Sequence, residues 1–152
     1  MTSKLEELAS TGLKELQELM QRTGYYALDS DHQVIQCSNL DDWARRYRLC
    51  DRHVGLNIRG KYRVSTIFIG IVSGMDLIRQ LEHPELPPLV FETMAWRGKE
   101  VLIHWRSASW SEAWTRHAGA LAFVERLAVA DFDAAKPEER GFGEREEPDG
   151  GS

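Results

Sequence analysis

The sequence predicts an α+β fold, in which amphipathic helices cover an antiparallel sheet of about four or five strands. The clearest strand is a run of β-branched and aromatic residues at positions 62–71. A hairpin pattern at positions 89–106 and helical periodicity near both ends supply the other layers. Apolar side chains occupy both parities of residues 62–71, so we expect a central strand with both faces covered. The C-terminal helix would cover one face, and the N-terminal helix or a second subunit the other.

The length and composition fit one domain with an extension at each end. We expect an amphipathic helix in residues 1–23, an α+β domain in residues 24–130 and a disordered acidic tail in residues 131–152. No stretch approaches the roughly 18 apolar residues of a membrane span, and the first residues are not signal-like. The sequence therefore predicts a soluble, cytoplasmic protein, with Cys37 and Cys50 as free thiols.

The formal net charge of −5 is unevenly distributed along the chain. Residues 45–63 contain seven basic residues and one acid, Asp51, which gives this basic segment a charge of +6. Residues 1–44 and residues 131–152 each contain eight acids and three bases, hence −5 each, and residues 64–130 carry −1. A basic segment therefore lies within an acidic protein.

The first helix is expected over residues 5–22. Ser3 and Glu6 have the spacing of a capping box, and Gly24 stands where a helix would end. Two interpretations of the leucine stripe of this helix stay open: it packs on the sheet, or it makes a homodimer or partner contact. The residues available for the second use include Leu5, Leu8, Leu16 and Leu19.

A short hairpin, a second helix and a strand should follow. Residues 25–28 and 34–37 flank a polar turn. Ser38 or Asn39 would cap the second helix, whose inward stripe is Leu40, Trp43, Ala44 and Tyr47. Alternation at 53–59 predicts a strand that turns at Gly60 into residues 62–71. Within the connection 72–87, residues 75–81 have room for one or two helical turns before the prolines.

The hairpin of residues 89–96 and 100–106 is expected to turn at Gly98 and Lys99. That loop would set Met94 opposite Ile103 and Glu92 opposite Trp105, with Trp96 opposite Val101. Ser109 and Glu112 then form a capping box for a helix that runs to about Ala130. Its inward residues are predicted to be Trp110, Ala113, Trp114, His117, Leu121, Val124 and Leu127 or Ala128.

Three segments carry a likeness to known proteins: residues 64–71 (VSTIFIGI), residues 88–94 (PLVFETM), and Trp110-Ser111-Glu112-Ala113 with His117. With residues 24–29, Trp43-Ala44-Arg45 and Asp51-Arg52, the set resembles a family of small phage- and prophage-encoded proteins of unassigned function, over about residues 24–127. Members commonly carry an Asp-His pair and a Gly-rich loop after the first strand, where this chain has residues 71–74 and an insertion. The resemblance implies a phage accessory protein in the cytoplasm of a host cell.

Glu92 is the residue with the most distinctive predicted environment. On an apolar sheet face its ionised form needs a partner, or its pKa rises. One interpretation is a general base or ligand-binding carboxylate near Ser65, Thr66 or His104. The other is a structural carboxylate paired with Arg63, a tryptophan N–H or backbone amides.

His104 and His117 would join Glu92 as candidate catalytic or metal-binding residues if the last helix crosses the hairpin. Their spacing matches no metal-ligand motif, and a histidine in a helical stripe is more often a packed core residue. The sequence contains no P-loop, dinucleotide fingerprint or nucleophile elbow. We therefore expect neither a metal nor a cofactor.

The basic segment has three open interpretations: a solvated or internally paired surface, a nucleic-acid or nucleotide site, and a site for an acidic protein. Its candidate binding residues are Arg45, Arg46, Arg48, Arg52, Arg59 and Lys61. The leading hypothesis for function is a non-enzymatic phage accessory protein that binds a host macromolecule, for example to inhibit a defence or regulatory complex. The alternatives are a nucleic-acid or nucleotide binder that uses residues 45–63 and a small enzyme built around Glu92.

Overall fold

The computed structural model describes residues 4–72 and 74–135, apart from the side chains of residues 16–23. Within these residues the predicted α+β fold is confirmed, with a four-stranded antiparallel sheet, a two-stranded sheet and four helices. In chain order the elements are α1 (Lys4–Thr23), β1 (Tyr26–Leu28), β2 (Val34–Gln36), α2 (Leu40–Leu49), β3 (His53–Arg59), β4 (Tyr62–Phe68), α3 (Gly74–Glu82), β5 (Phe91–Arg97), β6 (Glu100–Ser107) and α4 (Trp110–Ala135).

The large sheet is a meander of order β3-β4-β5-β6. Gly60 and Gly98, each with a φ of 58°, turn β3 into β4 and β5 into β6, because the left-handed conformation costs glycine little. Both predicted turns are therefore confirmed. β4 lies between β3 and β5, as expected for the central strand, and it ends at Phe68.

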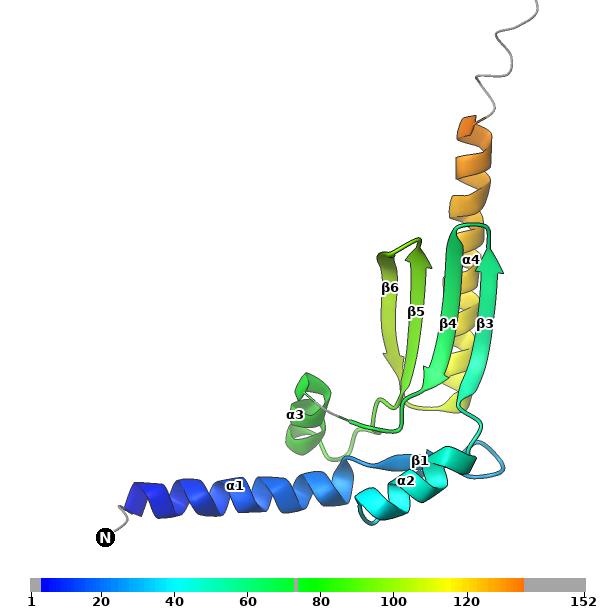
Figure 1. The fold of residues 1–152 in the computed structure, drawn as a ribbon. Helices are drawn as coiled ribbons and strands as arrows, with labels where there is room; N and C mark the ends of the chain where they lie inside the picture. The colour runs from blue at the N-terminus through cyan, green and yellow to red at the C-terminus, as the bar shows by residue number, and fades with distance from the viewer. Residues whose placement is uncertain (1–3, 73, 136–152) are drawn as a thin grey trace, which may run out of the picture.

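One face of this sheet is covered by α4, and the opposite face, which we call the open face, is not (Figure 1). Side chains alternate along β4, so every second one is buried beneath α4 and those between them point to the open face. The buried set is Tyr62, Val64, Thr66 and Phe68.

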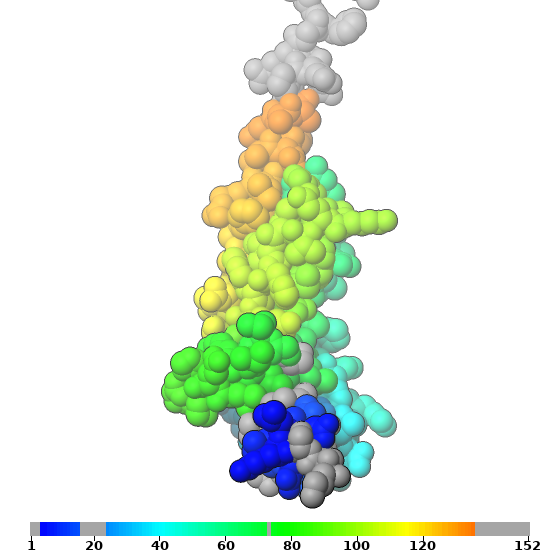
Figure 2. All heavy atoms as spheres, turned by 90° about the vertical axis from the view of Figure 1, so that its left-hand side faces the viewer, coloured from blue at the N-terminus to red at the C-terminus, as the bar shows by residue number. Residues whose placement is uncertain are grey.

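The N-terminal helix, one of the two covers predicted for the second face of the sheet, does not lie on that face, because α1 projects away from the sheet (Figure 1). A second subunit, the other predicted cover, stays a prediction. Gly24, which follows α1, accepts a hydrogen bond of 3.0 Å from the backbone N–H of Val72, beyond the end of β4. This contact fixes the end of α1 beside the end of the sheet, so no linker remains to fold the helix back over the open face. In Figure 2, α1 is seen end-on below α3 and the β5–β6 hairpin.

The small sheet, α2 and α3 form a layer at the end of the large sheet opposite the two glycine turns (Figure 1). We call this the α2 end, and the other the turn end. Gly70, with a φ of 68°, makes the close approach possible, since a Cβ atom there would lie 2.8 Å from the carbonyl oxygen of Tyr26. A chain of ring contacts, 3.8 to 6.2 Å between centroids, ties the layers together: His32, Trp110, Phe91, Phe68, Tyr47, Trp43 and Tyr25.

Three helical predictions differ from the structure. Trp114 was expected inward on α4 but is 49% exposed, because it lies at the flank of the contact with the sheet. Leu40 and Ala44 of α2 are also exposed, since that short helix packs on the small sheet mainly through its aromatic residues. α4 continues to Ala135, so residues 131–135 of the predicted tail are helical. The remainder of the predicted tail lies outside the described residues.

None of the helices in the described part of the chain is long and apolar enough to cross a membrane.

Candidate binding surface

A bulge in the β5–β6 hairpin determines which residues lie beside Glu92. The register of this strand pair shifts between Ala95 and Trp96. Because side chains alternate, one extra residue exchanges the two faces of a strand. The prediction that Glu92 lies opposite Trp105 was therefore wrong, and Arg106 is its cross-strand neighbour. Met94 likewise pairs with His104 rather than with Ile103, whereas the predicted pair of Trp96 and Val101 is confirmed.

Glu92 lies on the open face in a polar setting rather than an apolar one. Its Oε2 atom is 2.9 Å from Arg106 Nη2 and 3.0 Å from His104 Nε2. The Glu92 side chain is 20% exposed and that of His104 is 49% exposed, so water reaches this cluster. Arg63, the partner suggested from the sequence, instead lies over the ring of Trp96. The carboxylate is thus satisfied by two donors from β6.

His104 and His117 lie on opposite faces of the sheet and do not form a site together. His117 is buried under α4, where Nδ1 is 2.8 Å from Thr66 Oγ1 and Nε2 is 2.8 Å from Asn57 Oδ1. Thr66 Oγ1 is also 2.9 Å from Thr93 Oγ1. Of the neighbours predicted for Glu92, His104 is confirmed at 3.0 Å, whereas Thr66 faces α4 and lies on the other side of the sheet.

The hydrogen bonds of His117 determine which of its two ring nitrogens carries the proton. Asn57 Oδ1 can only accept, so Nε2 carries the hydrogen and Nδ1 accepts from the hydroxyl of Thr66. Burial lowers the pKa of His117 below its ordinary value of 6.5, which favours this neutral form. Both nitrogens of the imidazole ring are then paired within the core, as a buried polar group requires, and in this arrangement neither is left to bind a metal ion.

Beside the Glu92 cluster, the open face carries apolar and aromatic side chains. The guanidinium of Arg63 lies 4.2 Å from the ring centroid of Trp96, its cross-strand neighbour. Leu56 and Ile58, on the edge strand β3, are 63% and 62% exposed and point to the same face. We call the following set the open-face surface: Leu56, Ile58, Arg63, Ile67, Glu92, Met94, Trp96, His104 and Arg106.

The six predicted binding residues of the basic segment divide into two groups at opposite ends of β3 (Figure 1), whereas its seventh base, Arg63, lies over the ring of Trp96. At the α2 end, Arg46 and Arg45 bond Asp42 at 2.8 and 2.9 Å and hold the pKa of that carboxyl well below its usual range. Arg52 lies 4.8 Å from the ring centroid of Tyr47. Arg48 is exposed.

At the turn end, both basic residues of this group are paired with α4. Arg59 is 3.3 Å from Glu125, and Lys61 is 3.1 Å from Asp131, which also accepts a hydrogen bond from the hydroxyl of Tyr62. The predicted binding residues therefore do not form one continuous patch. Most of them are engaged within the protein, as one interpretation of the sequence proposed.

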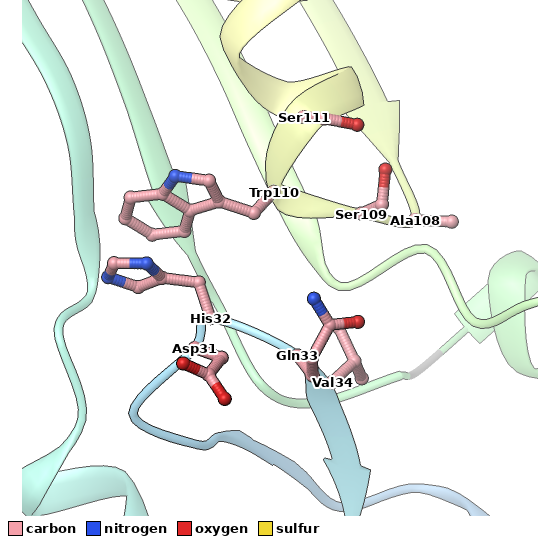
Figure 3. A pocket seen from close by; sticks show the side chains of 8 residues that line it. All are labelled: Asp31, His32, Gln33, Val34, Ala108, Ser109, Trp110 and Ser111. Carbon is pink, nitrogen blue, oxygen red and sulfur yellow. The ribbon is translucent and has the colours of Figure 1, made fainter.

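A separate cleft of about 360 Å³ lies where the β1–β2 turn meets the start of α4 (Figure 3). The imidazole of His32 stacks on the indole of Trp110, with ring centroids 3.8 Å apart and planes inclined by 12° (Figure 3). His32 has a φ of 59°, a conformation that costs a residue with a Cβ atom about 1 kcal/mol or more. Asp29 Oδ1 supports this turn by accepting from the backbone N–H groups of Asp31 and Gln33.

Sequence reasoning missed Arg106, Trp96 and the Leu56–Ile58 pair as members of one surface. Arg106 has the same parity as His104, so a bulge in the hairpin would have brought both to Glu92. No residue type in this segment indicates that bulge. Leu56 and Ile58 also share one parity of β3, but the alternation alone does not indicate whether that face is covered.

The described residues contain no group of three or more histidine, cysteine, aspartate or glutamate side chains that is placed to hold a metal ion. Glu92 lines none of the three clefts described for this part of the chain. Comparisons with protein-family models, with curated protein sequences and with solved structures yield no match for this chain.

Proposed function

We propose that the chain is a non-enzymatic binding protein that engages a protein partner through the open-face surface. In keeping with the resemblance of its strand motifs, we place it as a phage or prophage accessory protein whose partner is a macromolecule of the host cell. The observation that carries the proposal is the exposure of Leu56 and Ile58, at 63% and 62%, on a rigid sheet face that no element of the described chain covers.

The chemistry of the surface favours a protein as the partner. Tryptophan, methionine and arginine are enriched at protein–protein interfaces, and all three occur here as Trp96, Met94, Arg63 and Arg106. Charged residues within such an interface need partners of their own, and Glu92 already has two. The surface thus combines exposed aliphatic side chains with charges that are already paired within the protein.

The arrangement gives less support to nucleic-acid binding. Single-stranded nucleic acid is usually held by exposed aromatic rings above a continuous basic groove. Here the one indole within the open-face surface, Trp96, has Arg63 over its ring, and the basic segment is split between the two ends of β3. An enzyme built around Glu92 is supported less still, because the cluster lies on a sheet face outside the described clefts.

The test is affinity capture from a nuclease-treated host lysate, followed by mass spectrometry. Leu56→Asp/Ile58→Asp should remove the captured protein, because two carboxylates would have to be desolvated at the contact. Met75→Asp, which alters an exposed apolar residue of α3, is the matched control and should retain it. A partner that all three proteins capture equally, or one that is captured only from a parallel lysate without nuclease, would refute the proposal.

A homodimer through α1 remains part of this proposal. Leu5 and Leu8 are 78% and 63% exposed on a helix that projects from the domain, whereas the side chains of Leu16 and Leu19 lie outside the described part. An amphipathic helix without a packing surface is only marginally stable in water, so a second helix would stabilise it. Light scattering with and without residues 1–22 tests this contact, since an unchanged mass would exclude it.

A further inference from the structure

The outer edge of β3 has no neighbouring strand within the described part of the chain, since β3 is the first strand in the sheet order. Two hydrogen bonds at the end of β4 show which residues of β3 point outward. The backbone N–H of Phe68 donates to the carbonyl oxygen of Arg52, and that of Ile69 donates to Val90, each at 2.8 Å. Backbone groups alternate in direction along an antiparallel strand, so the even-numbered residues of β4 bond toward β3.

The exposed apolar residues of β3 are also the residues whose backbone groups point outward. The even-numbered residues of β4 lie opposite Gly55 and Asn57, which therefore bond within the sheet. Leu56 and Ile58 alternate with these two residues, so their N–H and C=O groups point away from the sheet. Both of their side chains are exposed on the open face. One short segment thus offers backbone hydrogen bonds and apolar contacts to a further strand.

The flank of α4 that adjoins β3 also presents apolar side chains. Glu125 pairs with Arg59 of β3 at 3.3 Å, which places Glu125 on the β3 side of the helix. Trp114 and Leu121 recur with Glu125 at the spacing of one helical stripe. Trp114 is exposed and its ring contacts His117, with centroids 6.3 Å apart, whereas Leu121 is half-buried. The edge of β3 therefore has apolar side chains on both sides of it.

We infer that the protein partner adds a strand to the outer edge of β3. Because side chains alternate along a strand, one row would lie beside Leu56 and Ile58 on the open face. The other row would lie against Trp114 and Leu121 on the flank of α4. The added strand would carry apolar residues on both parities, and its backbone would bond that of Leu56 and Ile58. This inference rests on the proposed function, because it specifies how the partner binds.

The charge at the α2 end of β3 favours a partner strand that has an acidic residue at that end. Arg48, Arg52 and His53 are exposed there. At the turn end, by contrast, Arg59 and Lys61 are already paired with carboxylates of α4. A carboxylate of the partner would therefore be attracted mainly to the α2 end, which sets the direction of the added strand.

The other edge of the sheet is less suited to strand addition. β6 carries His104 and Arg106 near its middle and end, and Trp105 has the guanidinium of Arg116 5.5 Å from its ring centroid. Charged side chains along an edge strand disfavour the addition of another strand. Residues 54–58 of β3 contain no charged side chain.

The edge of β3 stays accessible in the homodimer proposed through α1. In Figure 1, α1 extends to the left from the α2 end, whereas β3 is the rightmost strand of the large sheet. A contact between two α1 helices therefore leaves the edge of β3 free for a partner strand.

Selection from a random dodecapeptide library displayed on phage, with the full chain immobilised, tests the inference without a host partner. Enriched peptides should carry apolar residues on both parities and an acidic residue at one end. Ile58→Pro should bind a selected peptide at least tenfold more weakly than Ile58→Ala, because both lose the side chain but only proline lacks the N–H. Trp114→Ala should also weaken binding at least tenfold. Val101→Ala, which alters an exposed residue of β6, is the matched control and should bind as the wild type does.

Hydrogen exchange of the wild-type protein, with and without a selected peptide, gives a readout that needs no variant. The amide hydrogens of Leu56 and Ile58 should exchange at least tenfold more slowly when the peptide is bound. His104 is the internal control. It lies opposite Met94, whose backbone bonds toward β4, so the amide of His104 points outward from β6 and should exchange as before.

Recovery of no peptide above that from an uncoated surface would overturn the inference. So would slower exchange at His104 in place of Leu56 and Ile58, or equal binding by Ile58→Pro and Ile58→Ala. Slow exchange at Leu56 and Ile58 that increases with protein concentration, in the absence of peptide, would show that a second copy occupies the edge.

The outcomes for the proposed function and for strand addition are distinguishable. A host protein that is captured through Leu56 and Ile58 but leaves their amides exchanging freely would exclude strand addition and retain the proposed function. Peptide binding at the edge of β3 without any captured host protein would do the reverse.

Discussion

Glu92 on β5 and Arg106 on β6 lie opposite each other on the open face, with Oε2 and Nη2 2.9 Å apart. His104 shares the same carboxylate oxygen, and water reaches all three side chains. Partly solvated pairs of this kind contribute little to folding, because each charge is also well solvated in the unfolded chain.

We therefore expect Glu92→Gln to lower the free energy of unfolding by less than about 1 kcal/mol. Urea denaturation at pH 7 measures this change, with Glu100→Gln, which removes an exposed pair with Arg97, as a control. A sealed carboxylate would instead cost about 3–5 kcal/mol when its partnership is broken. A loss of that size would mean that the open face is covered in solution.

Gly55→Ala should destabilise the fold by about 1–3 kcal/mol, because overpacking a close contact forces its neighbours to move. A Cβ atom at position 55 would lie 2.7 to 2.9 Å from three atoms of the His117 ring, which is itself fixed by Thr66 and Asn57. Gly119→Ala is the matched control, since its Cβ atom would meet Trp105 at 3.9 Å, an ordinary contact. Thermal unfolding of the two variants compares them, and equal melting temperatures would contradict the packing of α4 on β3.

Stability should fall as the pH drops below about 6.5, because His117 is held neutral in the folded state. Its folded pKa is below its unfolded value, so the unfolded chain binds more protons at acidic pH. The contribution is complete above the unfolded pKa and decreases as the pH falls toward the folded one. Urea midpoints of wild type and His117→Gln between pH 5 and 7.5 measure it. The decrease should be smaller in the variant, and parallel curves would assign the acid sensitivity to other groups.

The sheet could be predicted from the sequence because each strand has a local residue pattern of its own. Alternation at 53–59, the β-branched run at 62–68 and the turns at Gly60 and Gly98 all rest on short-range sterics, and the structure confirms them. The site was harder to predict, because the neighbours of Glu92 depend on one β-bulge. No local sequence pattern indicates the position of that bulge. The uncovered face also escaped prediction, since apolar residues on both parities of a strand do not tell what covers each face, or whether the cover belongs to the same chain.

His32→Gly should destabilise the protein less than His32→Ala, by about 1 kcal/mol or more, because only glycine adopts a φ of 59° without strain. Both variants lose the stacking of the imidazole on Trp110, so their difference isolates the backbone conformation of the β1–β2 turn. Guanidinium unfolding followed by circular dichroism measures both free energies under the same conditions. Equal losses would show that residue 32 leaves the left-handed region once its ring is removed. The contacts of the ring, its stack on Trp110 and its 3.4 Å approach to Asp51, rather than Asp29 and the rest of the turn, would then be what hold it there.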